Sequence, residues 1–395
     1  MKGTKTKHQI SERSDLVTGN RVRRLTSLPG SHQHLYFTSK SFTRDSQSII
    51  CISNQDANPN IYQMSLQDGE SRQLTNNRDR YLMSYVYYDG TPFHGLGKAS
   101  VSYNPETNHV LYIQGNEVRL LDVDSLEEEV ISVLPNDVVT GFTHLSSDGR
   151  YACIPYIDAT AFDVGSGNKM KLIKDKVQSR QLESRVLVID TEKKISEVLF
   201  SHVGWITHVQ FSPVHNDEIL FNHEGGDVDQ RIWLYRHGAA VKIRDESIER
   251  GTVWICHEVW AANGSSIVYH GTKCMTGKFD ERSISFVGSF NLEKNNFVEV
   301  PFLPNMNHYG HFSISQDSGT LVTDGVITAN MLHHCVVDWN DQSLSWTPLC
   351  LHDSSFCVQD VHPHPVFSHD GHHVLFTSDV DSVPGMGNIY IVDIE

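Results

Sequence analysis

The amino-acid sequence predicts an all-β fold, a seven-bladed β-propeller, and repetition along the chain is the main reason. A phrase made of a polar turn and a short apolar strand occurs seven times in the 395 residues. In six copies a hairpin signature follows, with two β-prone runs around a polar turn. Because the sequence has no low-complexity tract or linker, we expect one domain over residues 1–395, with a polar N-terminal extension over residues 1–16.

The seven copies are spaced about 54 residues apart on average, which suits four-stranded blades with loop insertions. A representative copy reads FSHDGHHVLFTS from Phe367. The copies begin at Phe42, Tyr103, Leu145, Phe211, Ala261, Ile314 and Phe367. The charged stretch from Lys169 to Glu183 interrupts the third copy, and it predicts a short helix or an ordered loop.

The last copy lacks its outer strands, because the chain ends at Glu395 soon after NIYIVDIE begins. The phrase TGNRVRRLTSL, from Thr18 to Leu28, resembles the outer-strand phrase GESRQLT of another copy. We therefore expect the N-terminal strand to complete the last blade and close the ring, which removes the exposed sheet edges of an open array.

The charge and the cysteines narrow the possible partners and compartments. A formal net charge of -16 disfavours nucleic acid and anionic membranes, since both require a basic surface. Residues 1–16 contain no apolar run, and no stretch of about eighteen apolar residues occurs, so we expect neither a secretory signal nor a membrane span. The seven cysteines form no CxxC pair, which predicts reduced thiols and a cytoplasmic protein.

Histidines are abundant, 23 in all, and the densest group lies just before the last repeat. In an extended segment residues i and i+2 point the same way, so His362 and His364 can present two imidazoles to one point. Pro363 between them limits backbone freedom, and Gln359 can add an amide oxygen. A lone histidine is usually a surface or hydrogen-bonded residue, whereas this pair with a nearby glutamine favours metal binding.

The corresponding place one repeat earlier holds His308 and His311, either of which could supply a third imidazole. Three imidazoles and an amide oxygen form a borderline ligand set that suits Mn, Fe, Zn, Ni or Co. The set has none of the thiolates that would indicate a structural zinc site.

Two further segments, NHEGGDVDQRIW and WICHEVW, place polar side chains near equivalent junctions of loop and strand. Arg231 can pair with a substrate carboxylate through two parallel hydrogen bonds, or can be a structural residue bound to an acid such as Asp229. His257 can be a buried structural histidine or a neutral general base. The candidate substrate-binding residues are Arg231, His223, Glu224 and His208.

Three motifs, and their order along the chain, resemble those of the oligogalacturonate lyases, a family of pectin-degrading polysaccharide lyases. They are HPHPVFSHDGHHVLFTSD from His362, HEVW from His257, and HEG followed by RIWL between His223 and Leu234. The resemblance extends over essentially the whole chain. It implies a seven-bladed propeller with Mn²⁺, or another divalent metal, on three histidines and a glutamine, and the matching residues are His311, His362, His364 and Gln359.

The resemblance further implies that His257 is the catalytic histidine and that Arg231 binds substrate. A bound metal would act as a Lewis acid on the uronate carboxylate, Arg231 would neutralise charge, and neutral His257 would remove the C5 proton. The expected activity is that of a carbon–oxygen lyase, which cleaves short galacturonides by β-elimination to unsaturated keto-uronate monosaccharides in the cytoplasm.

Two alternatives remain open. The same chemistry could act on another uronic-acid disaccharide. A non-catalytic propeller of the TolB or WD type could instead serve as a binding platform, because propellers have many unrelated functions. Such a platform would bind no stoichiometric metal.

Overall fold

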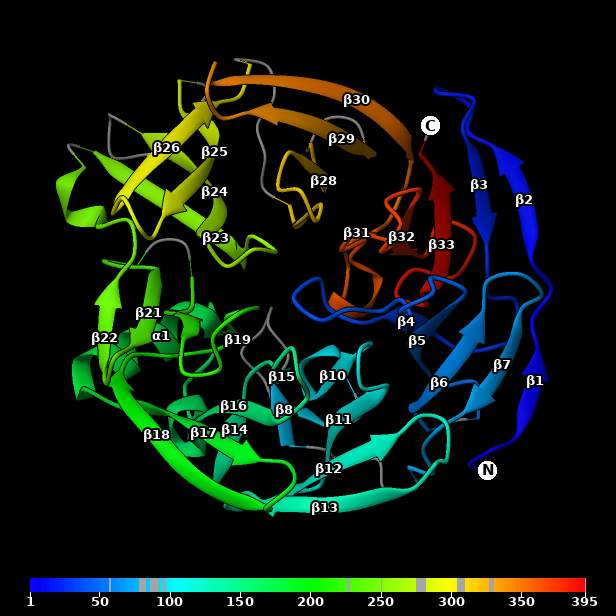
Figure 1. Cartoon of the computed structure of the whole chain (residues 1–395), viewed down its shortest axis with the longest axis horizontal. Helices are drawn as coiled ribbons and strands as arrows, with labels where there is room; N and C mark the ends of the chain where they lie inside the picture. Colours follow the sequence, from blue (N-terminus) through cyan, green and yellow to red (C-terminus); the bar gives the residue numbers. More distant parts are fainter. Residues whose placement is uncertain are drawn as a thin grey trace.

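Seven β-sheets surround a central axis in the described residues of the computed structural model, and each sheet forms one blade of a propeller (Figure 1). The structure describes residues 1–56, 58–77, 97–225, 228–249, 251–274, 282–303, 310–326 and 330–394, and in addition the backbone of 83–85 and 92–94. The predicted all-β, seven-bladed fold is therefore confirmed.

The first three blades contain the following strands. Blade 1 consists of β4 (His32–His34), β5 (Ser48–Ser53), β6 (Asn60–Ser65), β7 (Glu70–Gln73) and, at its outer edge, β1 (Lys5–Lys7). Blade 2 consists of β10 (Val101–Asn104), β11 (His109–Gln114), β12 (Glu117–Asp122) and β13 (Glu128–Val133). Blade 3 consists of β8 (Met83–Tyr85), β9 (Pro92–His94), β14 (Val138–Thr140), β15 (His144–Leu145), β16 (Tyr151–Asp158), β17 (Glu183–Asp190) and β18 (Ile195–Val203).

The remaining blades follow in chain order. Blade 4 consists of β19 (Val209–Phe211), β20 (Ile219–Asn222), β21 (Ile232–Arg236) and β22 (Ala239–Lys242). Blade 5 consists of β23 (Thr252–Trp260), β24 (Ser266–Cys274), β25 (Ile284–Asn291) and β26 (Asn296–Pro301). Blade 6 consists of β27 (Phe312–Ile314), β28 (Thr320–Val326), β29 (Met331–Asp338) and β30 (Ser343–Leu351). Blade 7 consists of β31 (Val366–Phe367), β32 (His373–Ser378), β33 (Asn388–Asp393), β3 (Arg21–Arg24) and β2 (Ser11–Ser14).

Position within a blade explains the composition of its strands. The middle strands β5 and β11 are buried over nearly their whole length, because each blade packs against a neighbour on both faces. Such strands consist of continuous runs of β-branched and other apolar residues. The outer strand β13 has only one buried residue, and it begins with two glutamates.

The stretch that the sequence assigns to a short helix or loop is helix α1 (Lys169–Arg180), which lies between β16 and β17 of blade 3. The Asn168 side chain accepts a hydrogen bond from the Lys171 N–H at the first turn, as an N-cap does. Gln181 adopts the left-handed conformation that often ends a helix. Ile173 and Val177 bury one face of α1 against the main apolar core, which holds the helix in place.

The two ends of the chain meet in blade 7, as predicted (Figure 1). Strand β3 pairs antiparallel with β33, with Val22 opposite Val392. Strand β2 pairs with β3, and β1 pairs with β7 of blade 1. The polar N-terminal extension is thus ordered as two outer strands on adjacent blades.

All seven cysteines are free thiols, and six of them are buried. In the described part of the chain, no helix has the length and apolar character needed to cross a bilayer.

We expect Val22→Ala to lower the free energy of unfolding by about 2 kcal/mol, because it opens a cavity at the ring closure. Val22 is buried in a cluster with Val374, Tyr390 and Val392. Urea unfolding measures the change, and Val17→Ala, at an exposed position of the same segment, is the control. Equal stability of the two variants would show that the closing strand contributes little.

The buried imidazole of His8 joins the N-terminal segment to the chain after β3. Its Nδ1 accepts hydrogen bonds from the N–H groups of Ser27, at 3.0 Å, and Leu28, at 3.3 Å. Burial, and then the neighbouring His32, lowers the pKa of His8 from 6.5 to about 4. When the pH falls below 6.5 the unfolded chain therefore takes up this proton before the folded chain does.

We expect stability to fall between pH 7 and pH 5, with about 1 kcal/mol of the loss dependent on His8 after allowance for solvent screening. In the His8→Asn variant the asparagine keeps an acceptor near the two N–H groups but has no titratable group. The unfolding free energy of this variant should therefore depend less on pH. Urea unfolding at both pH values measures this, with His215→Asn as a control at an exposed position. An unchanged pH dependence in His8→Asn would contradict the assignment.

Candidate active site

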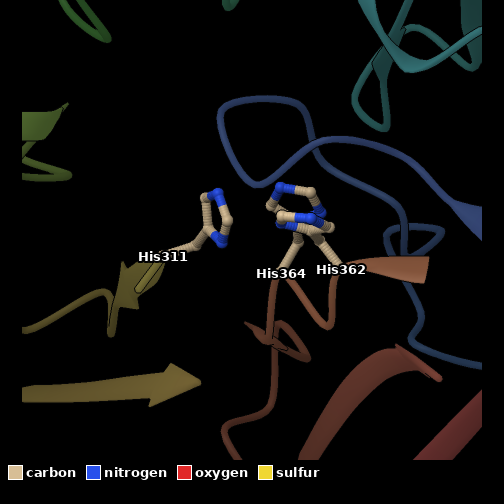
Figure 2. A group of neighbouring side chains, drawn as sticks. All are labelled: His311, His362 and His364. Carbon is tan, nitrogen blue, oxygen red and sulfur yellow. The ribbon is translucent and has the colours of Figure 1, made fainter. Parts of the chain in front are cut away.

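Three buried histidines from two adjacent blades converge near the centre of the ring. His311 precedes β27 of blade 6, while His362 and His364 precede β31 of blade 7. One ligand nitrogen from each lies within 4.8 Å of the other two, and the ring centroids of His311 and His364 are 3.9 Å apart. Figure 2 shows the His311 ring facing the other two rings from a separate segment. The structure therefore brings together the three imidazoles that the sequence proposed as metal ligands.

The backbone that presents the pair differs from the extended segment expected from sequence. His362 is extended, but His364 has a φ of 44°, in the left-handed region. Tertiary hydrogen bonds hold this conformation: the His364 N–H donates to Asp324 Oδ2 at 3.0 Å, and the His364 carbonyl oxygen lies 2.8 Å from His34 Nε2. Neither partner is local in sequence, so the turn could not be predicted from the HPHP motif.

Gln359 lies where the sequence places it, beside the pair. It belongs to the single turn of 3-10 helix Gln359–Val361, and its Nε2 is 3.3 Å from His364 Nε2. Its Oε1 is buried and has no hydrogen-bond partner among the residues that the structure describes. A buried amide oxygen without a partner is costly, and a cation next to the imidazoles would satisfy it.

Asp324, on β28, connects the two halves of the histidine group, a role that no motif in the sequence indicates. Its Oδ1 accepts from the His311 N–H at 2.6 Å, and its Oδ2 lies 3.1 Å from His311 Nδ1. Because Nδ1 is bonded to the carboxylate, Nε2 of His311 is left for a metal. Gly310 makes the approach possible, since a Cβ there would overlap the Asp324 carboxylate.

The charge state of Asp324 fits this role. Burial by itself would raise its pKa, but the electrostatic effect of the adjacent His311 and the hydrogen bonds from His311 hold the pKa well below its usual value. The carboxylate is therefore ionised at neutral pH, and it can orient His311 and partly balance the charge of a bound cation.

The imidazoles of His362 and His364 are held in the neutral form that binds metals. Burial, and then the nearby His311, lowers the pKa of His362 to about 3. The same two causes place the pKa of His364 well below its usual value. Neutral imidazole keeps a lone pair for coordination at neutral pH, so these two ligands need lose no proton when a metal binds.

Lys98 is a second residue at this site that the sequence did not indicate. Its Nζ is buried 3.1 Å from His364 Nδ1. Burial lowers the pKa of Lys98 to about 7, although Asp360 and Asp324 oppose the shift. Lys98 begins a short turn of 3-10 helix, and a lone lysine outside any motif carries no sequence signal for such a position.

A small pocket lies beside His311, next to the ring of His257, and in this structure it has no room for a water molecule. The residues that line it are Phe37, Thr38, His208, Arg231, His257 and Glu258. The His257 ring lies 4.5 Å from the His311 ring, centroid to centroid, so the proposed base is next to the proposed metal ligands. Burial, and then His311, holds the pKa of His257 well below its usual value, which keeps this imidazole neutral.

Arg231 is fully buried at the pocket, and its partner is Glu258 rather than the Asp229 suggested by sequence. Arg231 Nε donates to Glu258 Oε2 at 3.0 Å, and Nη1 donates to the carbonyl oxygens of His223 and Gly225 at 3.3 Å each. Burial raises the pKa of Glu258, while Arg231 acts in the opposite direction. These contacts fix the guanidinium rigidly at the pocket wall.

The other residues that the sequence indicated as substrate-binding or metal-binding candidates do not all lie at the pocket. The His208 ring stacks on Phe142, with centroids 4.6 Å apart, and lines the pocket. His223 Nε2 lies 3.0 Å from His202 Nδ1, outside the pocket lining. The Glu224 carboxylate is buried and accepts hydrogen bonds from the Thr207 hydroxyl and the Gly225 N–H. His308, the alternative third imidazole, lies outside the described residues.

Comparison with known proteins finds a family model and curated relatives that match nearly the whole chain. The family model described as oligogalacturonate lyase matches residues 1–395. The chain is 24% identical to the oligogalacturonate lyase of Dickeya dadantii, over 98% of this chain and 97% of the relative. It is equally similar to the oligogalacturonide lyase of Pectobacterium atrosepticum, at 24% identity and the same coverage.

Two solved structures share the fold at low sequence identity. One is described as an oligogalacturonate lyase in complex with manganese; it has a TM-score of 0.82 and 23% identity, over 100% of this chain and 98% of that one. The other is an oligogalacturonate lyase from Vibrio parahaemolyticus, with a TM-score of 0.81 and 23% identity, over 100% of this chain and 99% of that one.

We expect Asp324→Asn to weaken binding of a divalent cation, tested as Mn²⁺, by roughly 10- to 100-fold, because the carboxylate that orients His311 is lost. Isothermal titration calorimetry measures the affinity. Glu293→Gln, which removes one negative charge in an exposed turn, is the matched control. Unchanged affinity in Asp324→Asn would show that the carboxylate does not support the metal ligands.

Proposed function

The chain belongs to the oligogalacturonate lyase family, and we propose that it cleaves short galacturonides such as digalacturonate by metal-assisted β-elimination. One observation carries the proposal: three buried imidazoles converge on one point beside a pocket lined by His257 and Arg231. From digalacturonate the products are one unsaturated keto-uronate monosaccharide and one galacturonate. The substrate is an acidic oligosaccharide, which an acidic protein can bind when local positive charge dominates at the site.

The donor set fits a first-row divalent metal, and we propose Mn²⁺ held by His311, Gln359, His362 and His364. Three imidazoles and one amide oxygen are borderline ligands, and no thiolate belongs to the set. The buried Gln359 Oε1 has no hydrogen-bond partner within the described part of the chain, which supports its inclusion. When bound, the metal supplies Lewis-acid chemistry that stabilises negative charge on a uronate carboxylate.

Arg231 provides fixed positive charge at the pocket. Its guanidinium is held by Glu258 and by two backbone carbonyl groups, so it need not reorganise when charge develops on the substrate. We propose that it favours binding of the uronate carboxylate. His208, His223 and Glu224 are proposed as further substrate-binding residues, of which His208 lines the pocket.

His257 is proposed as the general base. Its neutral imidazole takes the C5 proton, the C5–H electron pair forms the C4–C5 double bond, and the C4–O bond breaks. The departing oxygen gains a proton from water and leaves as a hydroxyl group of the released sugar, and His257 then gives the C5 proton to the hydroxide that remains. The low pKa of His257 keeps the base unprotonated at neutral pH.

The free thiols support a reducing compartment, so we propose that the protein acts in the cytoplasm on imported oligouronides. The galacturonide is preferred over other uronides because the family model spans all 395 residues.

We expect the purified protein to form a product that absorbs ultraviolet light from digalacturonate, because elimination creates a double bond conjugated to the carboxylate. Exhaustive chelation should abolish product formation, and Mn²⁺ should restore it. A parallel assay with other uronic-acid disaccharides tests the substrate. Activity that survives chelation would exclude the metal role, and the absence of both product and stoichiometric metal would favour a binding platform.

His257→Ala tests the base in the same assay. It should lower kcat at least 100-fold while Mn²⁺ still binds, because the histidine is proposed to move a proton and not to hold the metal. Loss of bound Mn²⁺ in this variant would place His257 among the ligands instead. His215→Ala, at an exposed position, is the control.

A further inference from the structure

A β-bulge turns His257 toward a second buried histidine. Strands β23 and β24 pair with Cys256 opposite His270, and the register shifts between Cys256 and Val259. In a regular strand Cys256 and His257 would point to opposite faces, so His257 would point away from His270. The shift, with a φ of 54° at His257, brings the two rings to the same side.

The two imidazoles are hydrogen bonded to each other. His257 Nδ1 lies 2.7 Å from His270 Nε2, and the ring centroids are 5.0 Å apart. His270 is fully buried on β24, and its ring contacts the rings of Trp254 and Phe312 at centroid distances of 5.5 and 5.6 Å. The packed ring therefore cannot turn away, and the bond stabilises the unusual backbone at His257.

The hydrogen bond allows two proton arrangements with opposite consequences for a general base. If His270 donates, His257 carries its own proton on Nε2 and cannot accept one there. If His257 donates through Nδ1–H, its Nε2 keeps a lone pair for a substrate proton.

The surroundings favour the second arrangement. Arg231 lies with His257 at the pocket, and the proposed cation site at His311 is adjacent to the His257 ring. Glu258 lines the same pocket and balances the charge of Arg231, so the net positive charge on that side would come from the cation at the proposed site. That charge favours a lone pair facing the pocket and an N–H group facing away, toward His270.

We propose that His270 is a positioning residue that accepts the Nδ1–H of His257 and thereby leaves Nε2 free to take the substrate proton. This inference rests on the proposed function, in which His257 is the base. After proton transfer the same bond runs from an imidazolium to a neutral acceptor, which makes it stronger. A carboxylate in place of His270 would favour the protonated form of His257 before substrate binds, whereas a neutral histidine orients the base without adding negative charge.

The direct test is the tautomer of His257 by long-range ¹H–¹⁵N NMR on histidine-labelled protein. Zn²⁺ replaces Mn²⁺ in the sample because Mn²⁺ is paramagnetic, and loss of signals in His257→Gln gives the assignment. We expect a protonated Nδ1 and an unprotonated Nε2. A proton on Nε2 in the wild-type protein would overturn the inference.

Two substitutions separate positioning from packing. His270→Phe keeps a ring but removes the acceptor, so kcat should fall about 10- to 100-fold while KM and Mn²⁺ affinity change less than about twofold. His270→Gln places an amide oxygen near the Nε2 position and should restore most of the loss. His8→Asn, at a buried histidine near the N-terminus, is the control for disturbance of the core. Equal activity of the Phe and Gln variants would overturn the inference.

The outcomes also distinguish this inference from the proposed function. Full activity in His257→Ala would remove the proposed base, and the role of His270 with it. Loss of activity in His257→Ala, together with an Nε2–H tautomer in the wild-type protein, would leave the lyase mechanism standing and remove only the role of His270.

Discussion

The site depends on one buried carboxylate, that of Asp324, which joins two blades of the ring. It accepts hydrogen bonds from the backbone N–H groups of His311 and His364, and it also contacts the His311 ring. The same group thus sets the backbone of one proposed ligand and orients the imidazole of another. A carboxylate that stays ionised when buried requires such compensation, because an unpaired buried charge is very costly.

Burial and local charge explain how an acidic chain can handle an acidic sugar. The net charge of -16 is spread over the whole molecule, whereas the pocket has Arg231 at its wall and the three imidazoles beside it. Burial keeps His257 and His364 neutral, so their lone pairs remain available for a proton and a metal. Neutral nitrogen ligands also do not cancel the positive charge of a bound metal, so that charge can act on the substrate.

Two residues of this region have unusual backbone conformations. His257 and His364 both have positive φ, although neither is a glycine, and each is held by a hydrogen bond to a distant residue. Conformations of this kind persist where surrounding structure determines them, and they are common at functional sites. The closed ring supplies that surrounding structure, because strand β3 binds the last blade to the start of the chain.

Repetition and hydrophobic pattern determined the seven blades and the closure by the segment around Val22, because strand period and turn residues are local properties. The HPHP motif and the nearby Gln359 likewise indicated a metal site, although the roles of these residues stay predictions. Asp324, Lys98 and His270 were not foreseen, because each acts through a partner that only the packing of strands or blades places beside it. Sequence alone shows which residues can bind, whereas tertiary structure decides which nitrogen faces the pocket, since that depends on a hydrogen bond across strands.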